Sequence, residues 1–158
     1  MRRDAEVVVV RGPLDSAPIR PLPVEISQGS MLEVVVPFTD FSGTLAALSL
    51  AAQLGRNLDA RINLVALQTV PYGLELTRPP IALEWLEERL RDLALRSPID
   101  IHVDIILSRD GKWALRQVLK PHSLVVIGGR RRWWRTKEQR LADTLRHNGY
   151  RVISAYLQ

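Results

Sequence analysis

The chain has 158 residues, 46% of them hydrophobic and 25% charged, and this ordinary globular composition excludes a disordered or collagen-like protein. It contains no cysteine, which excludes a disulfide scaffold, a thiolate metal site and a cysteine nucleophile. The net charge of +5 comes from one stretch, 130–140, because the rest of the chain holds 16 basic and 16 acidic residues. The length predicts one compact domain.

The first thirty residues differ from the rest of the chain. A β-branched run at 6–11 is followed by four prolines and two glycines, and this composition is incompatible with a helix or a central strand. We therefore expect an N-terminal proline-rich arm over 1–30 and a main domain over 31–158. Residues 6–11 are expected to add as a strand to a sheet edge, either of this chain or of a partner.

From residue 31 the chain alternates strand and helix signals. Strands are expected where β-branched or alternating apolar residues gather, at 32–37, 62–67, 99–107, 124–128 and 152–156. Helices are expected where capping residues, opening prolines and apolar stripes recur, at 42–58 with Ser42 as N-cap, from Pro79 to Ser97, at 110–120, and from the Thr136 and Gln139 capping box to Asn148.

This alternation predicts an α/β fold, a doubly wound sheet of five parallel strands with helices on both faces. Residues 34–36 and 124–127 are apolar on both strand faces, so we place these strands at the centre, and the half-polar strand 99–107 near an edge. The two central strands send their helices in opposite directions, which makes their carboxyl ends a topological switch point where ligands are expected. Segments 37–42 and 128–132 meet there.

Both segments resemble landmarks of the universal stress protein family. Residues 36–42 (VPFTDFS) are similar to the pattern that ends the family's first strand, with about one extra residue before the aspartate. Residues 124–128 resemble its fourth strand, and 145–153 resemble its closing segment. The resemblance covers 31–158 and implies the family's fold, which is that of the adenine nucleotide alpha hydrolases, and a homodimer formed through the last strand.

ATP-binding members of that family carry spaced glycines after the fourth strand, because backbone N–H groups approach phosphates closely only where side chains are absent. This chain keeps Gly128 or Gly129 as the first glycine, but Arg131 or Arg132 stands at the second position and Glu138 falls near the third. The resemblance therefore implies a divergent member that lacks the ATP-binding loop. Asp40 occupies the position where the family's aspartate contacts adenosine, and it also suits capping of the next helix.

The basic stretch defines a second candidate site, the basic-aromatic patch. Guanidinium groups beside a helix N-terminus suit a small anion or a nucleotide phosphate, and arginine with tryptophan suits stacked single-stranded nucleic acid. A membrane surface, a crevice cover or a subunit contact are the other interpretations. The patch comprises Arg130, Arg131, Arg132, Trp133, Trp134, Arg135, Lys137 and Arg140. The candidate ligand-binding residues are Asp40, Gly128, Gly129, Arg130, Arg131, Arg132 and Thr136.

Signals for catalysis are missing from the sequence. His102, His122 and His147 are not spaced as metal ligands, and neither a nucleophile elbow nor a Walker loop occurs. We therefore expect a protein that is not an enzyme and has no metal or cofactor. No apolar run reaches the ~20 residues of a membrane span, and the N-terminal run is too short for a signal peptide, so a cytoplasmic protein is expected.

The leading hypothesis is a non-enzymatic universal-stress-protein-like domain, a dimeric stress-response or regulatory module that has lost the usual ATP-binding loop. One alternative is a divergent nucleotide- or anion-binding module that uses residues 128–136. A second alternative is nucleic-acid binding through residues 130–140.

Overall fold

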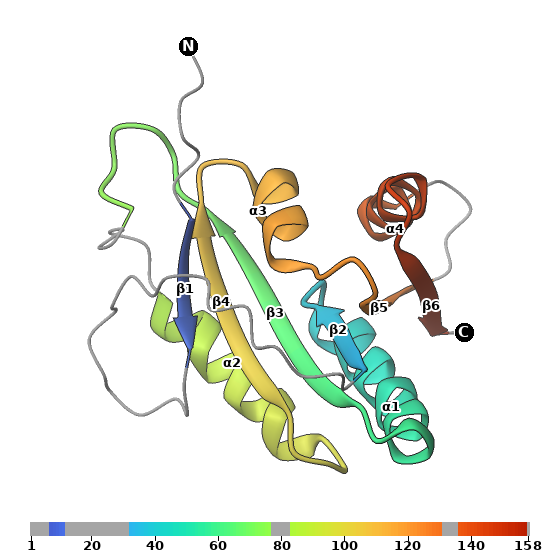
Figure 1. Ribbon diagram of the computed structural model, residues 1–158. Helices are drawn as coiled ribbons and strands as arrows, with labels where there is room; N and C mark the ends of the chain where they lie inside the picture. The colour runs from blue at the N-terminus through green and yellow to red at the C-terminus, as the bar shows by residue number, and fades with distance from the viewer. Residues whose placement is uncertain (1–6, 12–31, 77–82, 131–135, 158) are drawn as a thin grey trace.

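The structure is a computed structural model that describes residues 7–11, 32–76, 83–130 and 136–157 (Figure 1). These residues form six strands and four helices. In chain order they are β1 (Val7–Arg11), β2 (Glu33–Pro37), α1 (Phe41–Leu58), β3 (Arg61–Thr69), α2 (Leu83–Arg96), β4 (His102–Ser108), α3 (Gly111–Val118), β5 (Leu124–Arg130), α4 (Lys137–His147) and β6 (Arg151–Leu157). No helix among the described residues is both long and apolar enough to cross a membrane.

The strands form one sheet in the order β1-β4-β3-β2-β5-β6. The five strands from β2 to β6 are parallel, which confirms the predicted doubly wound α/β sheet. The central strands β2 and β5 are neighbours, as their two-sided apolar sequences predict, because parallel strands covered on both faces need apolar side chains on both.

The strand of the N-terminal arm lies against β4. β1 pairs antiparallel with β4 over the register from Val7 opposite Ser108 to Arg11 opposite Asp104. The expected edge strand is therefore confirmed, and it extends the sheet of its own chain. The division into an arm over 1–30 and a domain over 31–158 stays a prediction, since 12–31 lie outside the described residues.

Helices cover the sheet on both faces (Figure 1). On one face, Val34 and Val36 of β2 pack in a cluster with Leu48 of α1 and Leu90 of α2. On the other face, side chains such as Val35 pack with α3 and α4, chiefly through Leu115 and Leu145. Successive residues of β2 thus point into two cores, which is the period-two pattern of a buried strand.

Two local predictions need correction or confirmation at the helix ends. Of the two caps that the sequence offers for α1, the structure uses Asp40 and not Ser42, because the Asp40 carboxylate accepts a hydrogen bond from the backbone N–H of Gly43 at 2.7 Å. At α4 the capping box of Thr136 and Gln139 is confirmed, and the helix ends at His147 before Gly149, whose φ of +88° favours glycine.

Strand 99–107 is expected to be half-polar, but one of its polar side chains is buried and paired with a side chain of β3. Asp104 is only 2% exposed, and its carboxylate accepts a hydrogen bond of 2.9 Å from the side-chain amide of Asn63. The alternation of the strand is real, but Asp104 shares a strand face with Ile106, and that face is covered by the core that α3 contributes to. A buried carboxylate needs such partners, because leaving it unpaired in an apolar core is costly.

Candidate functional site

The switch point lies where β2 and β5 end side by side and the chain turns into α1. The hydroxyl of Thr39 donates a hydrogen bond of 2.9 Å to the carbonyl of Gly128, and the Thr39 N–H donates to the hydroxyl of Thr44 at 3.1 Å. The segments 37–42 and 128–130 are therefore brought together as predicted. These two hydrogen bonds hold the connection between β2 and α1 against both β5 and the first turn of α1.

The first turn of α1 rests directly on the backbone of β5. A Cβ atom placed on Gly128 would lie 1.7 Å from the carbonyl oxygen of Gly43, and a Cβ on Gly43 would lie 3.0 Å from the backbone of Gly128 and Gly129. Real Cβ atoms do not approach other atoms so closely, so this packing requires glycine at Gly128. The α-carbon of Gly128 is thus covered by α1.

The next residue, Gly129, meets α4. A Cβ atom on Gly129 would lie 3.4 Å from the Cβ and Cγ atoms of Glu138, and Gly129 is buried. The side chain of Glu138 therefore occupies the space beside Gly129. Each of the two glycines that the sequence suggests for phosphate binding has a protein neighbour in contact distance.

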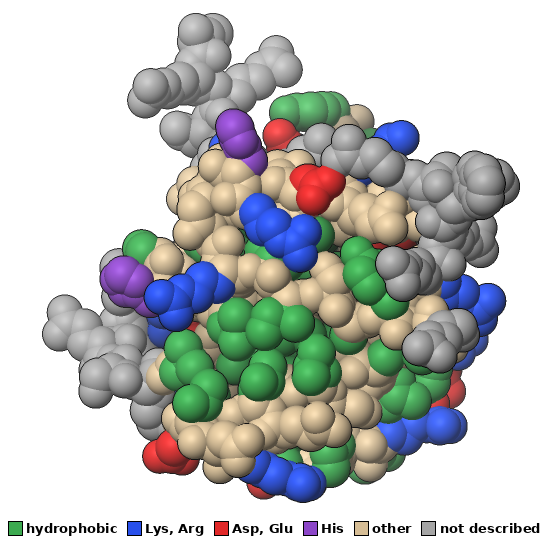
Figure 2. Space-filling model, turned by 90° about the vertical axis from the view of Figure 1, so that its right-hand side faces the viewer, with side chains coloured by type: hydrophobic (Ala, Val, Ile, Leu, Met, Phe, Trp, Pro, Cys, Tyr) green, Lys and Arg blue, Asp and Glu red, His purple; other side chains and the backbone are tan. Residues whose placement is uncertain are grey.

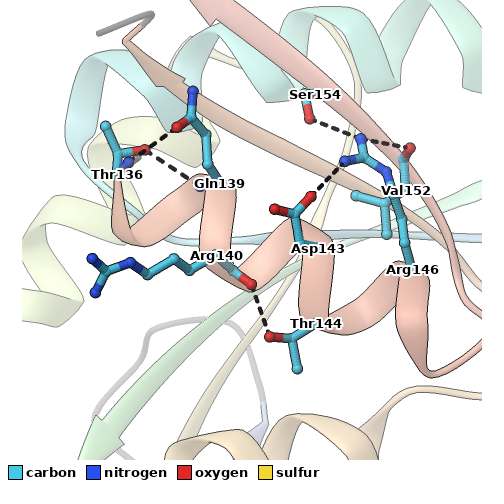
Figure 3. A network of polar contacts seen from close by, with 8 residues as sticks. All are labelled: Thr136, Gln139, Arg140, Asp143, Thr144, Arg146, Val152 and Ser154. Carbon is cyan, nitrogen blue, oxygen red and sulfur yellow. Dashed lines mark hydrogen bonds and ion pairs between the residues drawn. The ribbon is translucent and has the colours of Figure 1, made fainter. Parts of the chain in front are cut away.

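Both helices at the switch point carry their own N-terminal caps. A helix N-terminus attracts anions because its first N–H groups have no partner within the helix. At α1, the Asp40 carboxylate satisfies one of them; at α4, the Thr136 hydroxyl accepts from the Gln139 N–H at 3.3 Å, and the Gln139 side chain accepts from the Thr136 N–H at 3.1 Å (Figure 3). Asp40 and Thr136 are thus engaged as caps, and a ligand role for either stays a prediction.

The basic-aromatic patch is described only at its two ends. Arg130 ends β5 and is exposed, and Lys137 and Arg140 are exposed on α4. Five predicted residues lie outside the described part of the chain: Arg131, Arg132, Trp133, Trp134 and Arg135. Their proposed contacts with an anion, a nucleotide or a nucleic acid stay predictions.

Two members of the patch also line a groove that the sequence analysis missed. Lys137 and Arg140 contribute to a groove of about 410 Å³ between α3 and α4, together with Arg116. Arg116 is 21 or more residues away from the other two in sequence and belongs to a different helix. Only the packing of α3 beside α4 joins these cations, so no local pattern could have identified the group.

No metal centre is found within the described ranges, where no three histidine or acidic side chains cluster. His102 begins β4, His122 precedes β5 and His147 ends α4. The three histidines are thus placed on separate elements.

Similarity to known proteins is found among solved structures. No family model matches the chain. A search of the curated proteins finds no match either. Among the solved structures, the chain is similar to a universal stress protein whose structure was determined in complex with cAMP, at 18% sequence identity and a TM-score of 0.48. That similarity covers 82% of this chain and 100% of the other.

Proposed function

We propose that this protein is a non-enzymatic binding module of the universal-stress-protein type, which acts as a homodimer and does not hold ATP at its switch point. The observation that carries the proposal is the contact between Gly43 and Gly128. A phosphate-binding glycine must leave its backbone open to the ligand, whereas the α-carbon of Gly128 is packed against α1. A stress-response or regulatory role is what the family resemblance implies.

The charge beside Gly129 supports the same proposal. Glu138 lies in the first turn of α4 and contacts the position of a Gly129 side chain. A carboxylate there is favoured by the helix dipole, but it would repel the phosphates of a nucleotide. The chain thus supplies its own negative charge at the helix end where the family's ligand would place one.

Thermal unfolding with added nucleotides tests this part of the proposal. ATP, ADP, AMP, cyclic dinucleotides and cAMP, the ligand of the similar solved structure, should all leave the Tm unchanged. A ligand present at a hundredfold excess over its Kd would instead add about 2.7 kcal/mol to the stability. A saturable rise in Tm that Arg130→Gln abolishes would contradict the proposal and favour the nucleotide-binding alternative.

The dimer half of the proposal rests on β6. Among the described strands β6 pairs with β5 alone and so forms the sheet edge. Most of its residues are half-buried, including Val152, Ile153 and Ala155, while Tyr156 is 40% exposed. Figure 2 shows hydrophobic side chains gathered on the side of the molecule where β6 lies. An apolar strand with an unpaired edge favours pairing with another strand, so we place the subunit contact here.

Sedimentation velocity tests the dimer. Wild-type protein is expected to sediment as a dimer, and Tyr156→Lys as a monomer, because a charge on an edge strand blocks strand pairing. Leu95→Lys is the matched control, since Leu95 is 79% exposed on α2, which lies on the side of the sheet formed by β1 and β4 and away from β6 (Figure 1). A monomeric wild type, or a Tyr156→Lys variant that remains dimeric, would contradict this assignment.

A further inference from the structure

We propose that the groove between α3 and α4, the α3–α4 groove, binds an amphipathic organic anion, a small molecule with an apolar body and a carboxylate or phosphate head. The groove has a volume of about 410 Å³, which falls within the range of small-molecule sites. It lies on the sheet face that α3 and α4 cover, whereas Gly43 packs on β5 from the opposite face. The proposal therefore does not depend on the outcome at the switch point.

The floor of the groove is apolar and firmly held. It is lined by Leu115 of α3 and by Leu141 and Leu145 of α4. Leu115 and Leu145 are each 1% exposed and belong to the core of this sheet face, and Leu141 packs against that core. Leu115 and Leu145 therefore back the groove, and the apolar contact with a ligand comes chiefly from the partly buried Leu141 and from the aliphatic stems of the lining cations.

The rim of the groove is positive. Arg116, Lys137 and Arg140 all line it, and the lining residues that the structure describes include no acidic residue. Within the described part of the chain, none of these three cations forms an ion pair. A cleft lined by charges of one sign concentrates ions of the opposite sign, so the rim selects for an anion.

Arg146, on the same helix, differs from Arg140 in that its guanidinium group has partners within the protein. Arg146 pairs with Asp143 at 3.5 Å and donates to the hydroxyl of Ser154 at 3.2 Å, whereas the Arg140 side chain extends away from this network (Figure 3). Lys137 and Arg140 also lie at the first turns of α4, where the helix dipole disfavours positive charge. An anion bound between Lys137 and Arg140 would give them an ion-pair partner and would offset the unfavourable interaction with the helix dipole.

Two polar side chains of the lining, those of Thr144 and Asn148, are already hydrogen-bonded to the protein backbone, so the cations are the groups that recognise the head group of the ligand. The Thr144 hydroxyl donates to the carbonyl of Arg140 at 2.8 Å, and the Asn148 amide donates to the carbonyl of Thr144 at 2.8 Å. Both side chains thus use a donor within α4. The guanidinium groups of Arg116 and Arg140 are suited to a carboxylate or phosphate, which they contact with two parallel hydrogen bonds.

The dimensions favour a small molecule over a helix of a partner protein. Of α3 only Leu115 and Arg116 line the groove, whereas along α4 the lining runs from Lys137 to Asn148, about 16 Å at 1.5 Å per residue. A stable protein interface needs roughly 800 Å² on each partner, far more than such a short wall offers. An acyl or aromatic body of about ten carbon atoms fits within that length of α4.

Binding of decyl compounds to the full chain tests the proposal. Decanoate and decyl phosphate, used below their micelle concentrations, are expected to bind saturably at one per chain by calorimetry. Decyltrimethylammonium, with the same chain and the opposite charge, is expected not to bind. Binding of only one of the two anions would support the proposal and identify the head group.

Variants at the rim locate the site. Arg116→Gln with Arg140→Gln should weaken binding by about tenfold or more, because each removes a charge-assisted contact. Arg56→Gln on α1 is the matched control and should bind as the wild type does. The proposal is overturned if neither anion binds, if decyltrimethylammonium binds equally well, or if the double variant binds as the wild type does while its Tm is unchanged.

Discussion

The switch point and the α3–α4 groove use their residues in opposite ways. At the switch point, where the fold predicts a ligand, glycine brings two backbones into contact and the polar groups of Asp40 and Thr136 cap their own helices. In the groove, three cations surround an apolar floor without ion-pair partners among the described residues. The first region is arranged for packing, and the second has unmatched charge.

This contrast shows that a glycine at the end of a strand can have either of two structural roles. It can open the backbone to a phosphate, or it can let a helix approach the strand, and the sequence is the same in both cases. Which role the glycine has depends on the residue that faces it, and Gly128 faces Gly43 of α1.

The largest effect is expected from a methyl group at the switch point. Gly128→Ala should lower the free energy of unfolding by about 3 kcal/mol or more, because its Cβ would collide with the backbone of Gly43. Gly129→Ala is the matched control and should cost less than about 1 kcal/mol, since only the flexible side chain of Glu138 must shift. Urea unfolding measures both, and equal losses would mean that the Gly43 contact is not the constraint.

A smaller effect is expected from the cap of α1. Asp40→Ala should cost about 1 kcal/mol of stability because the Gly43 N–H loses its acceptor. Asp40→Asn should cost only a few tenths of that, since asparagine caps helices as well as aspartate does. If thermal or urea unfolding finds Asn as damaging as Ala, the negative charge and not the cap is what matters at this position.

The smallest effects come from the two arginines of α4. Arg146→Gln should cost about 0.5 kcal/mol, the usual value for an exposed ion pair, because it loses Asp143 and Ser154. Arg140→Gln should change the stability by less than about 0.3 kcal/mol, since an exposed side chain with no ion-pair partner among the described residues contributes little. A clear loss of stability in Arg140→Gln would indicate a structural partner and would weaken the case for an anion in the groove.

Much of the fold was predictable because its signals are local. Residues 34–36 and 124–127 are apolar on both faces, and this pattern placed β2 and β5 at the centre. The capping box at Thr136 was readable for the same reason, as its two partners are three residues apart. The sequence left the α1 cap open between Asp40 and Ser42, because both are good caps two residues apart and only the backbone path selects Asp40.

The arrangement of the candidate sites was not predictable, because it depends on contacts between distant residues. Gly43 and Gly128 are 85 residues apart, and nothing near either one indicates the other. Sequence alternation predicts that Asp104 points to solvent, because its partner in the core, Asn63, is 41 residues away in the sequence. Arg116 belongs with Arg140 only because α3 and α4 lie together.

Backbone amide shifts in a ¹⁵N NMR titration test the central claim most directly, because they report both regions in one sample. With ATP at millimolar concentration, the amides of Gly43, Gly128 and Gly129 should not shift. With decanoate, the amides of Arg116, Thr144 and Asn148 should shift saturably. Saturable shifts at the three glycines with ATP, or no shift along α3 and α4 with decanoate, would contradict the contrast drawn between the closed switch point and the open groove.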